Sequence, residues 1–218
     1  MDGATTHALT TRPVRSGGDG GNAARRGPGD GQPGGRGTQP PAVSTAVIGV
    51  AAALAAVTML FIAFTTAYLA RRQEPGWGTV VMPPILWLST AMLLASSGTL
   101  EWSRRRIAAG DIRGLKRGLA VTAGLGAAFL IGQLAAWRSL AVQGAYISSS
   151  PRSAFFYLLT GAHGAHLLGG LGALGIIVWK AYAGRYGVAS HAGVSVFALY
   201  WHFMALLWLY LFVLLFWA

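Results

Sequence analysis

Hydrophobic and polar residues form long separate blocks along this chain. Five apolar segments extend over about 43–70, 83–103, 116–140, 152–182 and 191–217. As a helix, each is long enough to cross a hydrocarbon core about 30 Å thick at about 1.5 Å of rise per residue. Pro83 and Pro84 open the second segment, and proline suits the first turn of a helix. The pattern predicts an all-α fold, a polytopic membrane helix bundle with five transmembrane helices.

The first 41 residues differ in composition from the rest of the chain. They contain eleven glycines and five prolines among scattered arginines, so they offer almost nothing to bury. Such a composition is typical of disorder. We therefore expect a disordered Gly/Pro/Arg-rich tail over 1–41 and a transmembrane domain over 42–218. The tail also lacks the short apolar centre of a secretory signal.

Basic residues are unevenly divided between the two ends of the predicted helices. Thirteen of the 17 lysines and arginines lie in the tail and in the loops after the second and fourth segments. The remaining four, on the other side, are Arg71, Arg72, Arg138 and Arg152. Because basic residues are enriched in cytoplasmic loops, the N-terminus is predicted to be cytoplasmic and the C-terminus outside. This placement also explains the net charge of +11 without nucleic acid as a partner.

Three histidines fall inside apolar segments, where an ionisable side chain is costly and suggests a function. His163 and His166 share one helix face in "FFYLLTGAHGAHLLGG", and His202 lies in the last segment. Haem or metal ligation is one interpretation, because His163 and His202 lie at similar depth when counted from the start of each segment. Proton handling is another. We favour interhelical hydrogen bonding, because a neutral imidazole both donates and accepts. Tyr157 and Gln133 are further polar side chains for such contacts.

A carboxylate lies at the cytoplasmic end of the second segment. Arg104 and Arg105 follow Glu101 at the i+3 and i+4 spacings that bring side chains together on a helix. We favour a surface ion pair. The alternative is a carboxylate that collects protons at a cytoplasmic entrance.

Small and aromatic residues in the last two segments indicate close helix packing. Glycine allows helices to approach closely in lipid, and six glycines crowd the fourth segment: Gly161, Gly164, Gly169, Gly170, Gly172 and Gly175. Trp201 and Trp208 share a face of the fifth segment and are predicted to pack against a partner helix or subunit. The chain has no cysteine, which removes iron–sulfur and thiolate copper sites. No catalytic constellation, phosphate loop or metal motif is recognisable.

Two sequence elements resemble subunit III of the haem–copper oxidases, in its bacterial five-helix form. That family combines a phenylalanine–tyrosine, threonine–glycine and two-histidine element with a tryptophan–histidine–phenylalanine element in the last helix. Here these residues are Phe156, Tyr157, Thr160, Gly161, His163 and His166, then Trp201, His202 and Phe203. The segments "MLFIAFTTAYLARR", "PPILWLSTAMLLASSGTLEWSRRR" and "GQLAAWRSL" are also similar, so the resemblance covers about residues 45–218.

The resemblance implies a non-catalytic membrane subunit of a respiratory terminal oxidase, most simply cytochrome c oxidase, in aerobic electron transport. The complex reduces oxygen to water and translocates protons. Its haem and copper are expected in the partner subunits, and this chain is expected to hold no cofactor other than bound phospholipid. Subunit I, subunit II and membrane lipids are the implied partners, in a bacterial inner membrane. Assembly, lipid binding, proton uptake and stability during turnover are the implied roles.

Two departures from the family weaken a direct proton role. Family members often carry a glutamate in the first of these helices, where this chain has Ala55 and Ala56, and an acid where Ala205 stands. Three other assignments stay open: subunit III of a quinol oxidase, the accessory protein of nitric oxide reductase, and an independent transporter or haem-binding membrane protein.

Overall fold

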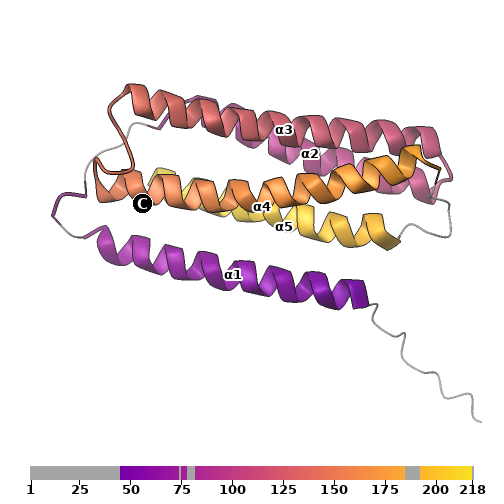
Figure 1. The fold of residues 1–218 in the computed structure, drawn as a ribbon, viewed down its shortest axis with the longest axis horizontal. Helices are drawn as coiled ribbons and strands as arrows, with labels where there is room; N and C mark the ends of the chain where they lie inside the picture. Colours follow the sequence, from indigo (N-terminus) through magenta and orange to yellow (C-terminus); the bar gives the residue numbers. More distant parts are fainter. Residues whose placement is uncertain (1–44, 74, 78–81, 185–191, 218) are drawn as a thin grey trace, which may run out of the picture. The chain divides into compact units, whose positions relative to one another are not determined.

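A computed structural model describes residues 45–73, 75–77, 82–184 and 192–217 (Figure 1). It has one helix in each predicted segment: α1 (Thr45–Arg71), α2 (Ile85–Ala108), α3 (Ile112–Val142), α4 (Pro151–Tyr182) and α5 (Ala192–Trp217). The all-helical prediction is therefore confirmed for the described residues. The tail over 1–41, with His7, lies outside them, as does His191.

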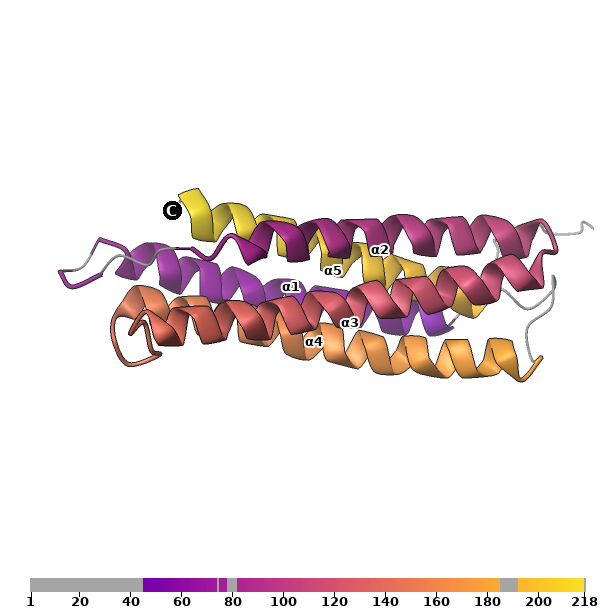
Figure 2. The ribbon, with the colours of Figure 1, turned by 90° about the horizontal axis from the view of Figure 1, so that it is seen from above.

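Four of the helices form a closed ring, and the first helix lies beside it. In the ring, α2 packs against α3, α3 against α4, α4 against α5, and α5 against α2. α1 packs only against α4 and α5 among the described residues. Figures 1 and 2 show the helices running side by side, with the α2–α3 hairpin on the side of the ring away from α1. This ring encloses most of the buried side chains.

The helix ends depart from the predicted bounds for local reasons. α3 begins four residues earlier than predicted, because the Asp111 side chain accepts a hydrogen bond from the Gly114 N–H at 2.8 Å and caps the helix. α2 continues through its arginines to Ala108, and Gly110, with φ of 76°, supplies the left-handed turn that follows. Pro84 occupies the N-cap of α2 and not its first turn.

Four of the five described helices are long and apolar enough to cross a membrane: α1, α3, α4 and α5. α2 is not among them, because its hydroxyl side chains and its charged last turns lower its hydropathy.

One end of the bundle collects basic residues from separate helices. There Lys116 of α3 lies over the Tyr182 ring of α4, with 5.2 Å between the ammonium nitrogen and the ring centroid.

Glycine provides close contact mainly on α3, whereas the sequence pattern pointed to α4. A Cβ added at Gly169, Gly172 or Gly175 of α4 would meet nothing within 4 Å. On α3, a Cβ at Gly126 would lie 2.8 Å from the Trp201 ring. A Cβ at Gly132 would lie 2.9 Å from that of Ser89. Of the α4 glycines, Gly170 is similarly tight, 2.9 Å from Tyr200. Close approach is therefore required where a glycine faces a buried indole, phenol or serine.

Gly126→Ala tests this packing, with Gly124→Ala on the same helix as its control. The added methyl at 126 meets the buried Trp201 ring, and overpacking of this kind costs about 1–3 kcal/mol. At 124 the methyl meets nothing within 4 Å. We expect Gly126→Ala to lower the thermal unfolding midpoint in lipid nanodiscs, while Gly124→Ala leaves it unchanged or raises it through better helix propensity. Equal midpoints for the two variants would contradict the packing shown by the structure.

Candidate functional site

Indole N–H groups connect neighbouring helices inside the ring. Trp208 Nε1 donates to Thr90 Oγ1 at 2.9 Å, and Trp201 Nε1 donates to Ser96 Oγ at 3.0 Å, so two hydrogen bonds join α5 to α2. Trp137 Nε1 donates to Thr160 Oγ1 at 3.0 Å and joins α3 to α4. An indole N–H can only donate a hydrogen bond, so a buried indole needs an acceptor such as a hydroxyl oxygen. As predicted, Trp201 and Trp208 pack against partner helices: their indole N–H groups bond α2, and their rings also lie against α3 and α4.

The hydroxyl groups that accept these bonds also donate. Thr90 Oγ1 donates to the Leu86 carbonyl at 2.7 Å, and Ser96 Oγ donates to the Leu93 carbonyl at 2.6 Å, both one turn earlier in α2. Each hydroxyl thus donates to its own helix and accepts from the next one. This arrangement satisfies the Thr90 and Ser96 hydroxyls without water, whereas Ser97 Oγ of the same helix is buried with no hydrogen-bond partner among the described residues.

Tyrosine hydroxyls add further links. Tyr200 donates to the His166 carbonyl at 2.8 Å, joining α5 to α4, and Tyr210 donates to Thr65 Oγ1 at 3.1 Å, joining α5 to α1. Tyr157 donates to the Ala145 carbonyl at 3.0 Å, just beyond the end of α3. Most of these pairs are not apparent from the pattern of residues along the chain. The spacing along the two antiparallel helices is nonetheless a usable signal. Trp208 and Trp201 are seven residues apart on α5, and their partners Thr90 and Ser96 are six residues apart on α2.

His163 is held by ring contacts. Its side chain is fully buried, with its ring centroid 5.1 Å from that of Trp208 on α5 and 5.8 Å from that of Phe129 on α3. Neither ring nitrogen has a hydrogen-bond partner among the described residues. In this structure His163 therefore contacts two neighbouring helices by packing, and its role as a brace stays a prediction.

The other two histidines lie in different surroundings. His166 Nδ1 is 2.7 Å from the Ala162 carbonyl of its own helix, and its ring meets the edge of Phe61 on α1. His202 Nε2 is 4.0 Å from Glu101 Oε2 of α2. The hydrogen bonds between helices that we expected from histidine come, in the described contacts, mainly from tryptophan and tyrosine.

The structure does not bring His163 and His202 to one site. His163 packs on Trp208, and His202 lies six residues earlier on α5, a separation of about 9 Å along the axis. The expectation of equal depth from counting along each segment is wrong, because α4 and α5 run in opposite directions and a count from opposite ends does not fix which residues of the two helices face each other. Among the described residues, no group of three or more histidine, aspartate or glutamate side chains is arranged to hold a metal.

Glu101 makes the contacts that its spacing predicts. Its Oε2 is 2.8 Å from Arg104 Nη1, and its Oε1 is 3.6 Å from Arg105 Nε. About a third of the Glu101 and Arg104 side chains is exposed. An ion pair this open to its surroundings contributes little to stability.

Gln133 makes a further polar contact inside the ring, as does Thr99 of α2, whose Oγ1 lies 2.8 Å from Thr122 Oγ1 of α3. Gln133 Nε2 donates to Ser89 Oγ at 3.3 Å and joins α3 to α2. Its Oε1 is buried without a hydrogen-bond partner among the described residues.

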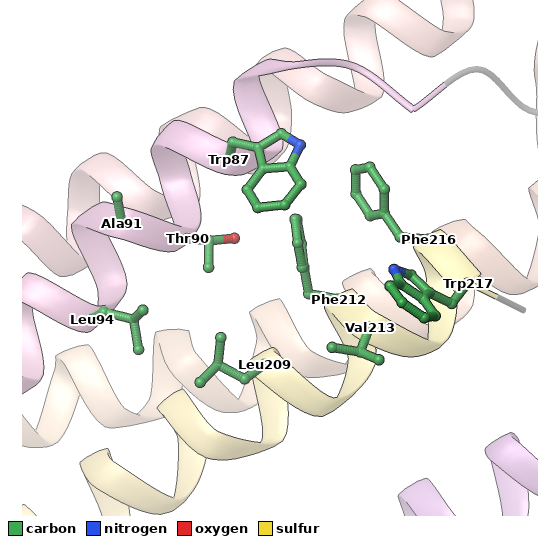
Figure 3. Close-up of a pocket in the computed structure, with 9 residues that line it drawn as sticks. All are labelled: Trp87, Thr90, Ala91, Leu94, Leu209, Phe212, Val213, Phe216 and Trp217. Atoms are coloured by element: carbon green, nitrogen blue, oxygen red, sulfur yellow. The ribbon is translucent and has the colours of Figure 1, made fainter.

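An apolar groove of about 400 Å³ runs between α2 and α5 (Figure 3). Aromatic rings dominate its lining, with Trp87 on α2 facing Phe212 and Phe216 on α5. Thr90 is its one hydroxyl, and that group is already bonded to Leu86 and Trp208. The groove therefore presents no group for acid–base or nucleophilic chemistry.

Sequence comparison places this helix bundle among known proteins. The family described as "Cytochrome c oxidase subunit III" matches residues 45–218, which include all five helices. The chain belongs to this family.

Several relatives are 31–32% identical to the chain over the aligned residues. Cytochrome c oxidase subunit 3 of Thermostichus vulcanus is 31% identical over 175 residues, which cover 78% of this chain and 86% of the relative. Cytochrome c oxidase subunit 3 of Synechocystis sp. is 32% identical over 78% of this chain and 74% of the relative. A probable cytochrome c oxidase subunit 3 of Mycobacterium bovis is 31% identical over 78% of this chain and 86% of the relative. The predicted membership of the haem–copper oxidase subunit III family is confirmed, and the chain is a membrane subunit of a multi-subunit oxidase.

A double-mutant cycle measures the link between α5 and α2. Trp208→Phe removes the indole donor and Thr90→Val removes the acceptor. Thr90→Val should therefore lower the free energy of unfolding less in the Trp208→Phe background than in the unsubstituted chain. Hydrogen bonds between membrane helices give coupling energies of about 0.6 kcal/mol on average and up to about 1.7. We expect a coupling in this range from unfolding in detergent.

The control cycle combines Trp217→Phe with Thr90→Val. Trp217 is 89% exposed on the same helix and should show no coupling to Thr90. Additive effects of Trp208→Phe and Thr90→Val would contradict the hydrogen bond.

Proposed function

We propose that this chain is the non-catalytic subunit III of a bacterial inner-membrane oxidase that takes electrons from cytochrome c. Its work is to stabilise the assembled complex. The observation that carries the proposal is a set of hydrogen bonds in the described interior, where the indoles of Trp137, Trp201 and Trp208 each donate to a hydroxyl of a neighbouring helix. The relatives above, each described as subunit 3 of a cytochrome c oxidase, support cytochrome c as the electron donor.

α2 is proposed to be the fifth transmembrane helix. Its low hydropathy comes partly from Ser89, Ser96 and Ser103, which are all buried against other helices. The side chains it exposes along the same length include Trp87, Leu88 and Leu94. A helix with its hydroxyls turned inward and apolar side chains outward suits a lipid surrounding.

A cytoplasmic N-terminus and an outside C-terminus complete the proposed topology. The end of the bundle that joins α2 to α3 carries Arg104, Arg105, Arg106, Arg113, Lys116 and Arg117. Lys180, at the end of α4, lies at the same end of the bundle (Figure 1). Basic residues favour the cytoplasmic side, so this end is assigned to the cytoplasm.

The subunit is proposed to support proton uptake indirectly and to need no cofactor of its own. Ala55, Ala56 and Ala205 stand where many family members have carboxylates, which leaves Glu101 as the acid nearest the membrane interior in α2. Its contacts with Arg104 and Arg105 are proposed to order the cytoplasmic end of α2. Haem and copper are assigned to subunits I and II, and phospholipid to the apolar grooves on the outside of the bundle.

Affinity purification through a tag on this chain tests the proposed assignment. In mild detergent we expect a haem-rich catalytic subunit and a copper-containing second subunit to co-purify, with cytochrome c oxidation activity. After dissociation, the tagged chain should retain neither haem nor copper in stoichiometric amount. A chain that purifies alone with its own haem spectrum would overturn the assignment, and a quinol-oxidising complex would change the electron donor.

Glu101→Gln separates the two roles proposed for this carboxylate. The amide keeps the shape of the side chain and removes its charge. If Glu101 only pairs with arginine, oxygen turnover and proton uptake by the oxidase in vesicles should stay within about twofold of the unsubstituted complex, since an exposed pair contributes little. Arg105→Gln is the matched control that breaks the weaker contact but keeps the carboxylate. Slower proton uptake with Glu101→Gln alone would assign it a direct role.

A further inference from the structure

The carboxylates of the α2–α3 hairpin are all in contact with arginines of α2. Glu101 Oε2 is 2.8 Å from Arg104 Nη1, and Glu101 Oε1 is 3.6 Å from Arg105 Nε. Asp111, between the two helices, has its Oδ2 3.4 Å from Arg106 Nη1, and its Oδ1 caps α3. The negative charge of this hairpin therefore balances the basic residues of α2.

The basic residues at the start of α3 have no such partners. Arg113, Lys116 and Arg117 make no ion pair within the described residues. No aspartate or glutamate follows Asp111 in the sequence, so the three later helices and the segments between them supply no carboxylate side chain. The tail over 1–41 is itself basic, with five arginines against three aspartates. These three cations therefore have to be balanced by something other than the chain around them.

The three cations share one surface of α3, which we call the α3 basic surface. Arg113 is three residues from Lys116 and four from Arg117, the spacings that bring side chains together on a helix. Arg113 and Arg117 are exposed, and Lys116 is half-buried. The side of α3 that faces α2 is a different one, because a Cβ added at Gly118 would lie 2.9 Å from the Trp102 ring. Like charges at these spacings repel one another and destabilise a helix, so a bound anion would relieve them.

Lys116 joins the α3 basic surface to α4. Its ammonium nitrogen is 5.2 Å from the centroid of the Tyr182 ring. That ring is 59% exposed, and Trp179, one turn earlier in α4, is 58% exposed. Exposed tyrosine and tryptophan rings are enriched at the level of the lipid head groups. The surface therefore combines three cations and two amphipathic rings at the junction of two long apolar helices.

This chemistry fits the head group of an anionic phospholipid. Guanidinium and ammonium groups are the side chains that bind phosphate. Basic sites between helices on the cytoplasmic side of a membrane bind anionic lipid head groups. A zwitterionic head group also carries an ammonium, which the three cations would repel. An acidic segment of another subunit has the right charge, but the exposed rings beside Lys116 favour a lipid neighbour.

We propose that Arg113, Lys116 and Arg117 bind the phosphate of an anionic phospholipid in the cytoplasmic leaflet. The lipid supplies the negative charge that the chain lacks here, and it contacts α3 and α4 together through Lys116 and Tyr182. The inference deepens the lipid contacts of the proposed function by naming the lipid class and its ligands. It rests on the cytoplasmic placement of this end that is proposed above.

Photo-cross-linking of the full-length chain in its complex tests the site. The complex is placed in phosphatidylcholine nanodiscs that contain a small fraction of phosphatidylglycerol with a photoreactive head group. We expect labelling of residues 112–120, and competition by unlabelled phosphatidylglycerol. A phosphatidylcholine probe that labels these residues equally would overturn the proposal. Displacement of the lipid probe by soluble glycerol phosphate would also overturn it, because the site would then bind free phosphate.

Lys116→Gln and Arg105→Gln are charge-matched variants that separate a defined site from diffuse attraction. Each removes one positive charge from the same end of the bundle, but Arg105 already contacts Glu101. We expect Lys116→Gln to lower the affinity for phosphatidylglycerol about fivefold, the effect of one basic residue near an anionic lipid surface. Lys116→Arg should restore the affinity, and Arg105→Gln should leave it nearly unchanged. Equal losses in Lys116→Gln and Arg105→Gln would overturn the site, since only the total charge would then matter.

A density map of the intact complex provides a second readout. We expect a lipid phosphate within about 4 Å of Lys116 Nζ, the distance of an ion pair. A carboxylate of a partner subunit at that position would overturn the proposal.

Failure of this inference can be told apart from failure of the proposed function. A chain that does not co-purify with an oxidase would overturn the proposed function, and lipid labelling of α3 could still be measured on that chain. An oxidase complex with α3 unlabelled would overturn the lipid site alone.

Discussion

Lipid offers no hydrogen-bond partners, so polar groups inside a membrane bundle are best satisfied by the protein itself, and this constraint sets how α2 lies against α5. The indoles of Trp201 and Trp208 each meet a hydroxyl on α2, and each hydroxyl also bonds its own backbone. These paired bonds fix the rotation of α2 about its axis and its height relative to α5. The ring is then closed by α3 and α4, which are joined by Trp137 and Thr160.

The same constraint explains why the least apolar helix can belong to a membrane bundle. α2 carries hydroxyls at Ser89, Thr90 and Ser96 on its inner face and apolar side chains on its outer face. Its charges are confined to the last turns, where Glu101 contacts two arginines. A chain built this way uses its polar residues to hold helices together. That is consistent with a subunit that contributes to oxygen reduction by keeping the assembled oxidase stable during turnover.

Much of this architecture could be predicted from the sequence, because hydropathy and charge act locally. The five segments and their order follow from apolar runs, and the family follows from the motifs around His163 and His202. The pairing of side chains could not be predicted in the same way. It depends on the height of one helix against another, so His163 and His202 were expected at one depth and lie apart. Close glycine contact was expected on α4 and occurs mainly on α3, because the buried indole of Trp201 and the side chain of Ser89 face α3.

The orientation of α2 is the central claim, and the absence of cysteine allows it to be measured directly with single introduced cysteines. Spin labels at successive α2 positions of the oxidase in lipid report contact with dissolved oxygen and with water-soluble nickel. The account predicts low access for both at Ser89, Leu93 and Ser96, and high oxygen access at outward positions such as Leu88 and Leu94 wherever lipid covers them. Access of oxygen or nickel to the three inward positions, with Leu88 and Leu94 protected, would contradict it.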